Sequence, residues 1–216
     1  MTQDPQRGIW DSFWADHRYS GNIFHRMIWR IRFLFSRAYA IRIFNYMGKN
    51  PNAKLLEVGC GSARTLHYLD TFLGGSLCVG LDLSTIALKL LLSISPTYHA
   101  GVGSAFELPL VDDKFDASFS IGLIEHFTRK QAADMVNEKI RVTRPNGVVG
   151  IMVPWQSSVY NLIVRRAFGR HWPFGNENPF RRTELATFME ALGLQDVKIH
   201  IIYGSTLLGI GRKESR

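Results

Sequence analysis

Short apolar runs alternate with amphipathic stretches along most of this chain. Runs rich in branched and aromatic residues predict seven β-strands, near residues 54–60, 76–83, 97–103, 115–122, 147–153, 195–203 and 206–212. Stretches with helical periodicity predict helices near residues 62–73, 84–94, 129–143 and 182–192. Alternating strands and helices are typical of an α/β fold, in which helices cover both faces of a doubly wound, mostly parallel sheet.

Two segments lie outside this alternation. In residues 8–47 one side of a predicted helix is apolar and the other is basic: Phe24, Ile28, Ile31 and Phe35 recur at helical spacing, opposite Arg26, Arg30 and Arg37. We expect an N-terminal helical cap over residues 1–50 and a sheet domain over residues 51–216, with an insertion at about 155–181. Both segments are candidate lids, because ligands of such sheets bind beyond the carboxyl ends of the strands.

A glycine turn follows the first predicted strand, and an acid ends the second. The turn reads Glu57-Val58-Gly59-Cys60-Gly61, and Asp82 follows about twenty residues later. This βαβ pattern lets a ligand approach the backbone closely, and the acid can hold the two hydroxyls of a ribose. A dinucleotide is disfavoured, because Arg64 stands where a third glycine or alanine belongs and Glu57 would repel a pyrophosphate. The P-loop pattern is absent.

The Glu-x-Gly-x-Gly turn and the acid after it resemble the class I S-adenosylmethionine-dependent methyltransferases. Further segments resemble this family in order and spacing: Gly103 to Leu110, Asp112 to Phe119, Gly122 to Phe127 and Thr143 to Gly147. The resemblance implies a Rossmann-like sheet of seven strands with one antiparallel member, and the short link Tyr203-Gly204-Ser205 favours a hairpin there. It also implies S-adenosylmethionine as the cofactor, a ribonucleoside with a sulfonium cation and no phosphate.

The same resemblance assigns the cofactor-binding residues. The expected set is Glu57, Gly59, Cys60, Gly61, Asp82, Leu83, Ser104, Ala105, Phe106 and Ile121. Asp82 would bind the ribose hydroxyls, and Leu83 would lie against the adenine. Ser104 departs from the family, which carries an acid there for the adenine amino group, and a serine hydroxyl accepts more weakly. The structural alternative is a strand-end ion pair for Glu57 and a helix N-cap role for Asp82.

Glu125 and His126 follow the fourth predicted strand, on the expected acceptor side. His126 can accept a proton or polarise a hydroxyl during methyl transfer, a reaction whose rate depends largely on alignment. The alternative is that the pair opens a helix and forms local hydrogen bonds. No metal is expected, because two adjacent residues do not make a metal site. Further candidates for the acceptor pocket are His17, Tyr19, Trp155, Tyr160 and His171.

The charge distribution and the composition of the chain limit which binding partners and which compartment we expect. The net charge of +8 is concentrated in residues 1–50, with eight basic against three acidic residues, and in residues 165–182, with five against one. This asymmetry indicates an anionic partner or surface near those segments. The cysteines Cys60 and Cys78 form no metal or disulfide pattern, and no signal peptide is recognisable, so we expect a cytoplasmic protein. Peripheral contact of the basic helix with an anionic membrane is an alternative to its packing on the domain.

Three functions remain open. The leading one is methyl transfer to a small-molecule or lipid-like acceptor at oxygen, nitrogen or carbon. The second is methylation of RNA or protein, with the basic, aromatic segments as the footprint. Nucleic acid is the less favoured partner, because no recognised nucleic-acid-binding module is present. The third is a non-catalytic cofactor-binding protein, which the serine at position 104 would support. No pattern predicts an oligomeric state.

Overall fold

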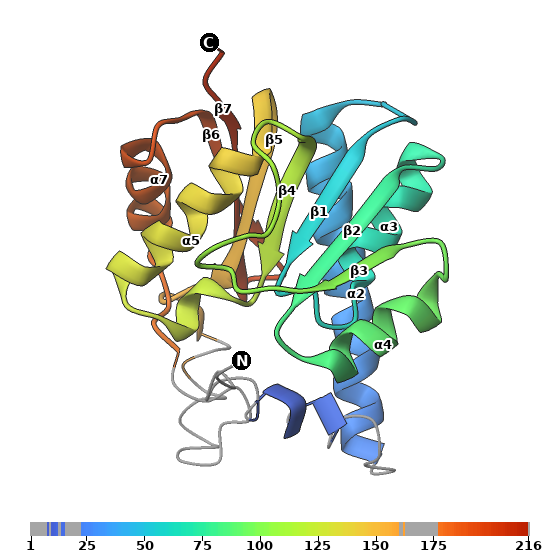
Figure 1. Cartoon of the computed structure of the whole chain (residues 1–216). Helices are drawn as coiled ribbons and strands as arrows, with labels where there is room; N and C mark the ends of the chain where they lie inside the picture. The colour runs from blue at the N-terminus through green and yellow to red at the C-terminus, as the bar shows by residue number, and fades with distance from the viewer. Residues whose placement is uncertain are drawn as a thin grey trace. The chain divides into compact units, whose positions relative to one another are not determined.

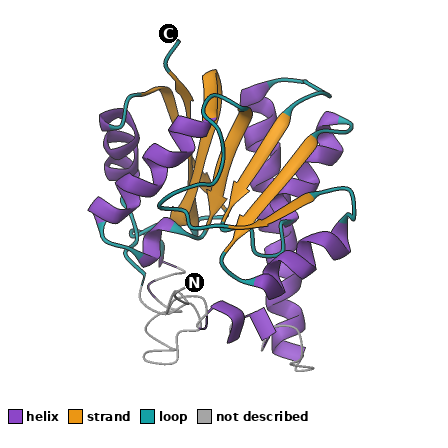
Figure 2. Ribbon diagram, viewed as in Figure 1, coloured by secondary structure: helices purple, strands orange, loops and turns teal. Residues whose placement is uncertain are grey.

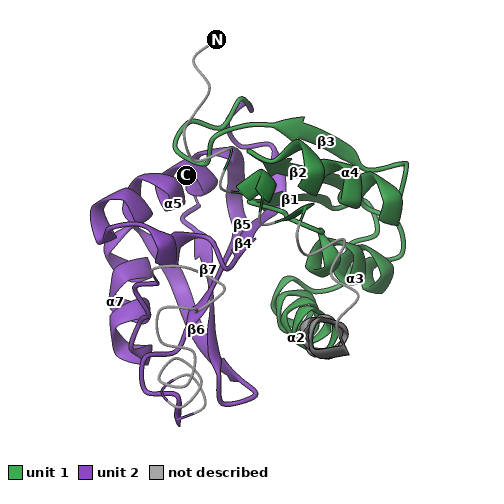
Figure 3. Cartoon of the chain, turned by 90° about the horizontal axis from the view of Figure 1, so that it is seen from below, with its two compact units in different colours: residues 1–109 green, residues 110–216 purple. Residues whose placement is uncertain are grey.

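Seven strands form one sheet with the order β3-β2-β1-β4-β5-β7-β6 (Figure 1). The computed structural model describes residues 8, 10–12, 14–15, 23–159, 162 and 177–215, with the backbone alone for residues 23–32. Helices and strands alternate as the sequence predicts, so the α/β class and the mostly parallel sheet are confirmed (Figure 2). The chain divides into two compact units, residues 1–109 and 110–216 (Figure 3).

The first unit contains three parallel strands and the helices that connect them. Its strands are β1 (Lys54–Val58), β2 (Leu77–Asp82) and β3 (His99–Val102), and its connecting helices are α3 (Arg64–Leu73) and α4 (Thr85–Ile94). The β1 residues from Leu55 to Val58 are all buried, as in a parallel strand that is covered on both faces. In the register, Lys54 lies opposite Leu77, so β1 and β2 end near each other at Val58 and Asp82.

Helix α2 (Ile23–Met47) precedes β1 and packs on α3 (Figure 1). The ring of Phe44 meets that of Phe72 in α3 edge to face, with 6.0 Å between centroids. The Arg64 guanidinium lies over the Phe33 ring at 3.6 Å. The C-terminal half of α2 therefore buries its apolar side against protein, with the fully covered residues Tyr39, Ala40 and Ile43.

The N-terminal half of the predicted apolar stripe has no described side chains. Phe24, Ile28 and Ile31 thus lie outside the described side chains, whereas Phe35 contacts Tyr39 with ring centroids 6.0 Å apart. Over the described part of the chain, no helix combines the length and the apolar content that a membrane span requires.

The second unit contains four strands, of which β7 runs against its neighbours. Its elements are β4 (Phe115–Ile121), η1 (Ile124–His126), α5 (Arg129–Val142), β5 (Thr143–Pro154), α7 (Arg182–Ala191), β6 (Leu194–Ile202) and β7 (Thr206–Lys213). β4 and β5 are parallel, whereas β7 is antiparallel to both β5 and β6. The β6–β7 hairpin is confirmed, and Tyr203 and Gly204 both have positive φ, 47° and 63°, as a type I′ turn requires.

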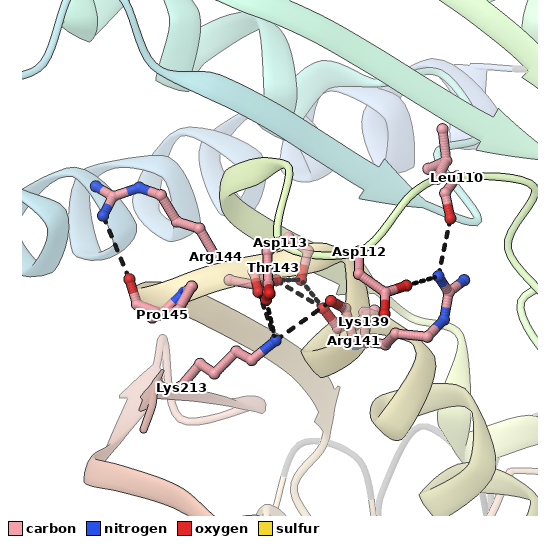
Figure 4. A network of polar contacts seen from close by, with 10 residues as sticks. Leu110, Asp112, Asp113, Lys139, Arg141, Thr143, Arg144, Pro145 and Lys213 are labelled. Carbon is pink, nitrogen blue, oxygen red and sulfur yellow. Dashed lines mark hydrogen bonds and ion pairs between the residues drawn. The ribbon is translucent and has the colours of Figure 1, made fainter. Parts of the chain in front are cut away.

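Strand β5 begins earlier than predicted, at Thr143, directly after α5. A network of polar contacts holds this junction (Figure 4). Lys213 Nζ donates to Asp113 Oδ1 at 2.6 Å and to the Thr143 carbonyl at 2.9 Å. Arg141 donates to Asp112 Oδ1 at 2.6 Å and to the Leu110 carbonyl at 2.8 Å. The network joins the last strand to the turn before β4, and it lies at the end where β4 begins.

Candidate functional site

The glycine turn after β1 is held open by residues in the left-handed region. Gly59 has φ of 64° and Gly61 has φ of 50°, conformations that glycine adopts without steric cost. The Cys60 N–H donates to the Leu81 carbonyl at 3.0 Å, which ties the turn to β2. Helix α3 follows at once, and its N-cap Ala63 supplies no side-chain cap. The predicted turn residues thus lie together at the carboxyl ends of β1 and β2.

Asp82 joins the glycine turn to the end of β2. Its Oδ2 accepts from the Gly61 N–H and its Oδ1 accepts from the Ser84 N–H, each at 2.8 Å. Burial raises the pKa of Asp82, while these backbone N–H groups oppose the rise. The helix N-cap is Ser84, whose Oγ accepts from the Ala87 N–H, so the alternative role for Asp82 as the cap is wrong. A carboxylate has about four acceptor sites, so Asp82 keeps capacity for a hydroxyl donor beside these N–H groups.

Glu57 is a buried acid near the end of β1. Its side chain is 2% exposed, and Oε2 accepts from the Leu66 N–H of α3 at 3.2 Å. The alternative of a strand-end ion pair is wrong for the described residues, none of which forms an ion pair with Glu57. Burial raises the pKa of Glu57 to about 8, with a further contribution from Asp82. A cation brought to this position would favour the ionised form.

Two residues near the N-terminus cover the glycine turn. Trp14 is buried, and its indole lies on Gly61, because a Cβ added there would come within 2.3 Å of Cζ2. Asp11 Oδ1 accepts from Ser84 Oγ at 2.5 Å, and its charge contributes to the raised pKa of Asp82. Neither residue is predicted by the sequence motifs. Their signal was the spacing of two tryptophans, Trp10 and Trp14, around an acid in a short helical segment.

The turn after β3 also lies at the end of β2. The Gly103 N–H donates to the Asp82 carbonyl at 3.2 Å. Ser104 Oγ accepts from the Phe106 N–H at 3.2 Å, so this serine shapes its own turn. Leu83, Ser104 and Ala105 are half-buried, and Phe106 is exposed. Nine of the ten predicted cofactor-binding residues thus lie at the carboxyl ends of the three strands of the first unit, and Ile121 ends β4 in the second.

Glu125 and His126 form the short helix η1 just beyond β4. Glu125 is 3% exposed, and His126 is half-buried. Burial raises the pKa of Glu125 to about 8. The Glu125 carbonyl accepts from the Asn178 N–H at 2.7 Å, and Asn178 Nδ2 donates to the Phe127 carbonyl at 3.1 Å. Among the described residues, no group of three or more potential metal ligands occurs.

Arg129 holds the segment that carries Asn178 against α5. Its guanidinium donates to the carbonyls of Asn178 and Pro179, at 3.0 and 2.9 Å, and to Glu184 at 2.8 Å. The same group lies 3.5 Å above the Phe180 ring. Residues 177–181 therefore form a strap across η1, which fixes the backbone of Glu125.

The predicted acceptor-pocket residues are mostly outside the described part of the chain. His17, Tyr19, Tyr160 and His171 fall there, as does most of the predicted insertion. Trp155 is described and half-buried. Its backbone N–H donates to the Ser205 carbonyl of the β6–β7 turn at 3.1 Å. Its backbone also forms an isolated β-bridge with Phe180. The structure thus places Trp155 against the hairpin and the strap.

Part of the sequence is similar to those of known methyltransferases. Residues 56–151 match the methyltransferase domain family. The norajmaline N-methyltransferase of Rauvolfia serpentina is 28% identical in an alignment of 162 positions, which covers 68% of this chain and 53% of the relative. The chain therefore spans about half the length of that relative.

Solved structures show the same fold. The magnesium protoporphyrin IX methyltransferase of Synechocystis PCC 6803, with bound S-adenosylhomocysteine, superposes with a TM-score of 0.73 at 12% identity, covering 98% of each chain. A possible histamine N-methyltransferase of Thermotoga maritima gives 0.70 at 16% identity and covers 92% of this chain and 98% of its own. At these identities the likeness concerns the fold.

Replacing Gly61 by alanine should destabilise the chain more than the same change at Gly74. Both glycines have positive φ, but a Cβ at Gly74 meets open space, whereas one at Gly61 meets the Trp14 ring. We expect urea unfolding to show a loss of about 1 kcal/mol for Gly74→Ala and about 2–4 kcal/mol for Gly61→Ala. Equal losses would mean that Trp14 does not pack on the turn.

Replacing Glu57 by glutamine should change how stability depends on pH. Because the folded pKa of Glu57 is raised from 4.5 to about 8, the folded state binds more protons, and stability falls as pH rises through this window. Relative to the wild type, Glu57→Gln should gain up to about 1 kcal/mol per pH unit between pH 5 and 8 in urea unfolding. The exposed Glu107→Gln is the control, and a parallel curve for Glu57→Gln would contradict the assignment.

Proposed function

We propose that the chain is a class I S-adenosylmethionine-dependent methyltransferase that transfers the cofactor's methyl group to a small-molecule acceptor. The observation that carries this proposal is the buried pair of acids, Glu57 and Asp82, at the two sides of an open glycine turn. Asp82 accepts from backbone N–H groups and keeps capacity for a hydroxyl donor. Burial raises the pKa of Glu57, and a cation bound beside it would lower that pKa again.

These residues fit the proposed cofactor group by group. The ribose hydroxyls would be held by Asp82, and the backbone of Gly59 and Gly61 leaves room for close approach. The cationic amino acid portion would lie near Glu57. The Trp14 side chain would cover the glycine turn on the side of the N-terminal segment. When bound, S-adenosylmethionine supplies a methyl group on a positively charged sulfur.

The acceptor side of the proposal rests on Glu125 and His126. Both lie beyond the carboxyl end of β4, the end at which ligands of open α/β sheets bind. Either side chain can hold a proton that the acceptor loses, and a carboxyl with a pKa of about 8 is matched to neutral pH. The strap of residues 177–181 keeps this part of the backbone in place.

A small-molecule acceptor is supported by the name of the curated relative. The Rauvolfia protein is named for N-methylation of norajmaline. A lipid-like acceptor belongs to the same proposal, since its reacting group would meet the same residues. Methylation of RNA or protein is the second candidate, and no specific observation in the described residues favours it; most of the basic segment 165–182 lies outside them.

The proposal is tested by incubating the chain with methyl-tritiated S-adenosylmethionine and a cell extract. The products are then separated into organic, aqueous small-molecule and acid-precipitable fractions. We expect label in one of the first two fractions, reduced at least about tenfold by Asp82→Ala, since charged hydrogen bonds contribute about 1.5–3 kcal/mol each. The exposed Asp134→Ala serves as the matched control. Label confined to the precipitable fraction would contradict a small-molecule acceptor.

A further inference from the structure

A short helical segment near the N-terminus lies against the candidate cofactor site of the first unit. The described residues 8, 10–12, 14 and 15 are helical, and Ser12 Oγ donates to the Gly8 carbonyl one turn earlier at 3.0 Å. Asp11 and Trp14 are three positions apart, so their side chains share one face of this helix. Figure 1 shows the segment in dark blue beyond the carboxyl ends of β1 and β2, where the glycine turn lies.

Trp14 restricts the second glycine of the turn. Trp14 is 7% exposed, and a Cβ added to Gly61 would lie 2.3 Å from Cζ2 of the indole and 2.6 Å from Cη2. Even a methyl group therefore does not fit between the two residues. Glycine has the widest choice of backbone conformations, and Gly61 has φ of 50° while its N–H donates to Asp82 Oδ2. The packed indole leaves this glycine little room to change conformation and lose that hydrogen bond.

Asp11 binds the other residue whose backbone N–H holds Asp82. Ser84 is 0% exposed, and its Oγ donates to Asp11 Oδ1 at 2.5 Å. The same Oγ accepts from the Ala87 N–H at 3.3 Å as the cap of α4, and the Ser84 N–H donates to Asp82 Oδ1 at 2.8 Å. Because an ionised carboxylate only accepts, the hydroxyl proton points to Asp11 and the oxygen lone pairs serve the helix cap. Asp11 therefore orients the Ser84 hydroxyl and holds the start of α4.

The two contacts converge on one carboxylate. Gly61 and Ser84 donate to the two oxygens of Asp82, and each of them is held by one residue of the helical segment. The orientation of the Asp82 carboxylate decides which lone pairs face a ligand, and hydrogen bonds weaken steeply as their geometry departs from linear. All of these residues belong to the first unit, so the arrangement needs no contact with the second.

We propose that Asp11 and Trp14 are positioning residues of the cofactor site, which orient the Asp82 carboxylate toward a ribose hydroxyl. The inference rests on the proposed function and deepens it, because it makes the N-terminal helical segment part of the nucleoside-binding site. Asp11 acts through Ser84, and Trp14 acts through Gly61. Neither residue has to touch the cofactor, so the loss of either one lowers affinity only while Asp82 can respond.

The test is a double-mutant cycle, measured by calorimetric titration of the full chain with S-adenosylhomocysteine. We expect Asp11→Ala to raise the dissociation constant about threefold or more, the fold-change of one typical hydrogen bond, and Asp11→Asn, which keeps an acceptor oxygen, to raise it less. In the Asp82→Asn background, Asp11→Ala should have almost no further effect, because the residue through which it acts has changed. Equal fold-changes in both backgrounds would overturn the proposal.

Trp14 is tested in the same cycle. Trp14→Ala should also raise the dissociation constant, and a lower constant would overturn its role, because the indole would then obstruct the turn. Phe72→Ala is the matched control, since it removes an aromatic contact with Phe44 near the C-terminal end of α3 and should leave affinity unchanged. Urea unfolding of the same variants separates a loss of stability from a loss of affinity.

The wild type distinguishes this inference from the proposed function. If the wild type does not bind S-adenosylhomocysteine, the proposed function is wrong and this inference with it. If the wild type binds and neither Asp11→Ala nor Trp14→Ala changes the affinity, only this inference is wrong.

Discussion

The Asp82 carboxylate is the interaction on which the candidate cofactor site depends. Its two oxygens bind the backbone N–H groups of Gly61 and Ser84, and so fasten the glycine turn to the start of α4. The left-handed Gly61 then leaves its Cα face free for the Trp14 indole, and Ser84 is free to cap α4 and to bind Asp11. Strand end, turn, helix cap and N-terminal segment thus meet at one carboxylate.

Each compact unit buries one acid with a strongly raised pKa near the carboxyl end of a strand. Glu57 is the last residue but one of β1, next to the glycine turn, and Glu125 follows β4 beside the Asn178 strap. Burying an acid without a cation opposes folding, so neither position is explained by stability. Both positions are explained if each acid binds a positively charged group of a ligand. For Glu57 this charge would belong to the cofactor, and for Glu125 to the acceptor.

The sequence predicts the elements well because the pattern of apolar residues is strong. The runs that become β1 and β2 are buried on both faces, and Tyr203-Gly204 meets the backbone needs of the β6–β7 turn. Strand β5 starts early because Lys213, remote in sequence, bonds at its first residue. Local periodicity carries no information about such long-range contacts.

The candidate site was only partly predictable from the sequence, because some of its residues are brought together by long-range contacts. The glycine turn and Asp82 are local motifs, and they were found. Trp14 and Asp11 act through contacts with Gly61 and Ser84, which lie far along the chain.

The central claim is that Asp82 and the glycine turn hold a ribonucleoside cofactor. Calorimetric titration of the whole chain with S-adenosylhomocysteine tests it most directly, with Asp82→Asn as the variant, because asparagine keeps the shape but loses the charge and one acceptor oxygen. The account predicts saturable binding to the wild type, a dissociation constant about tenfold or more higher for Asp82→Asn, and no change for Glu107→Gln. Equal affinity of Asp82→Asn and the wild type would contradict it.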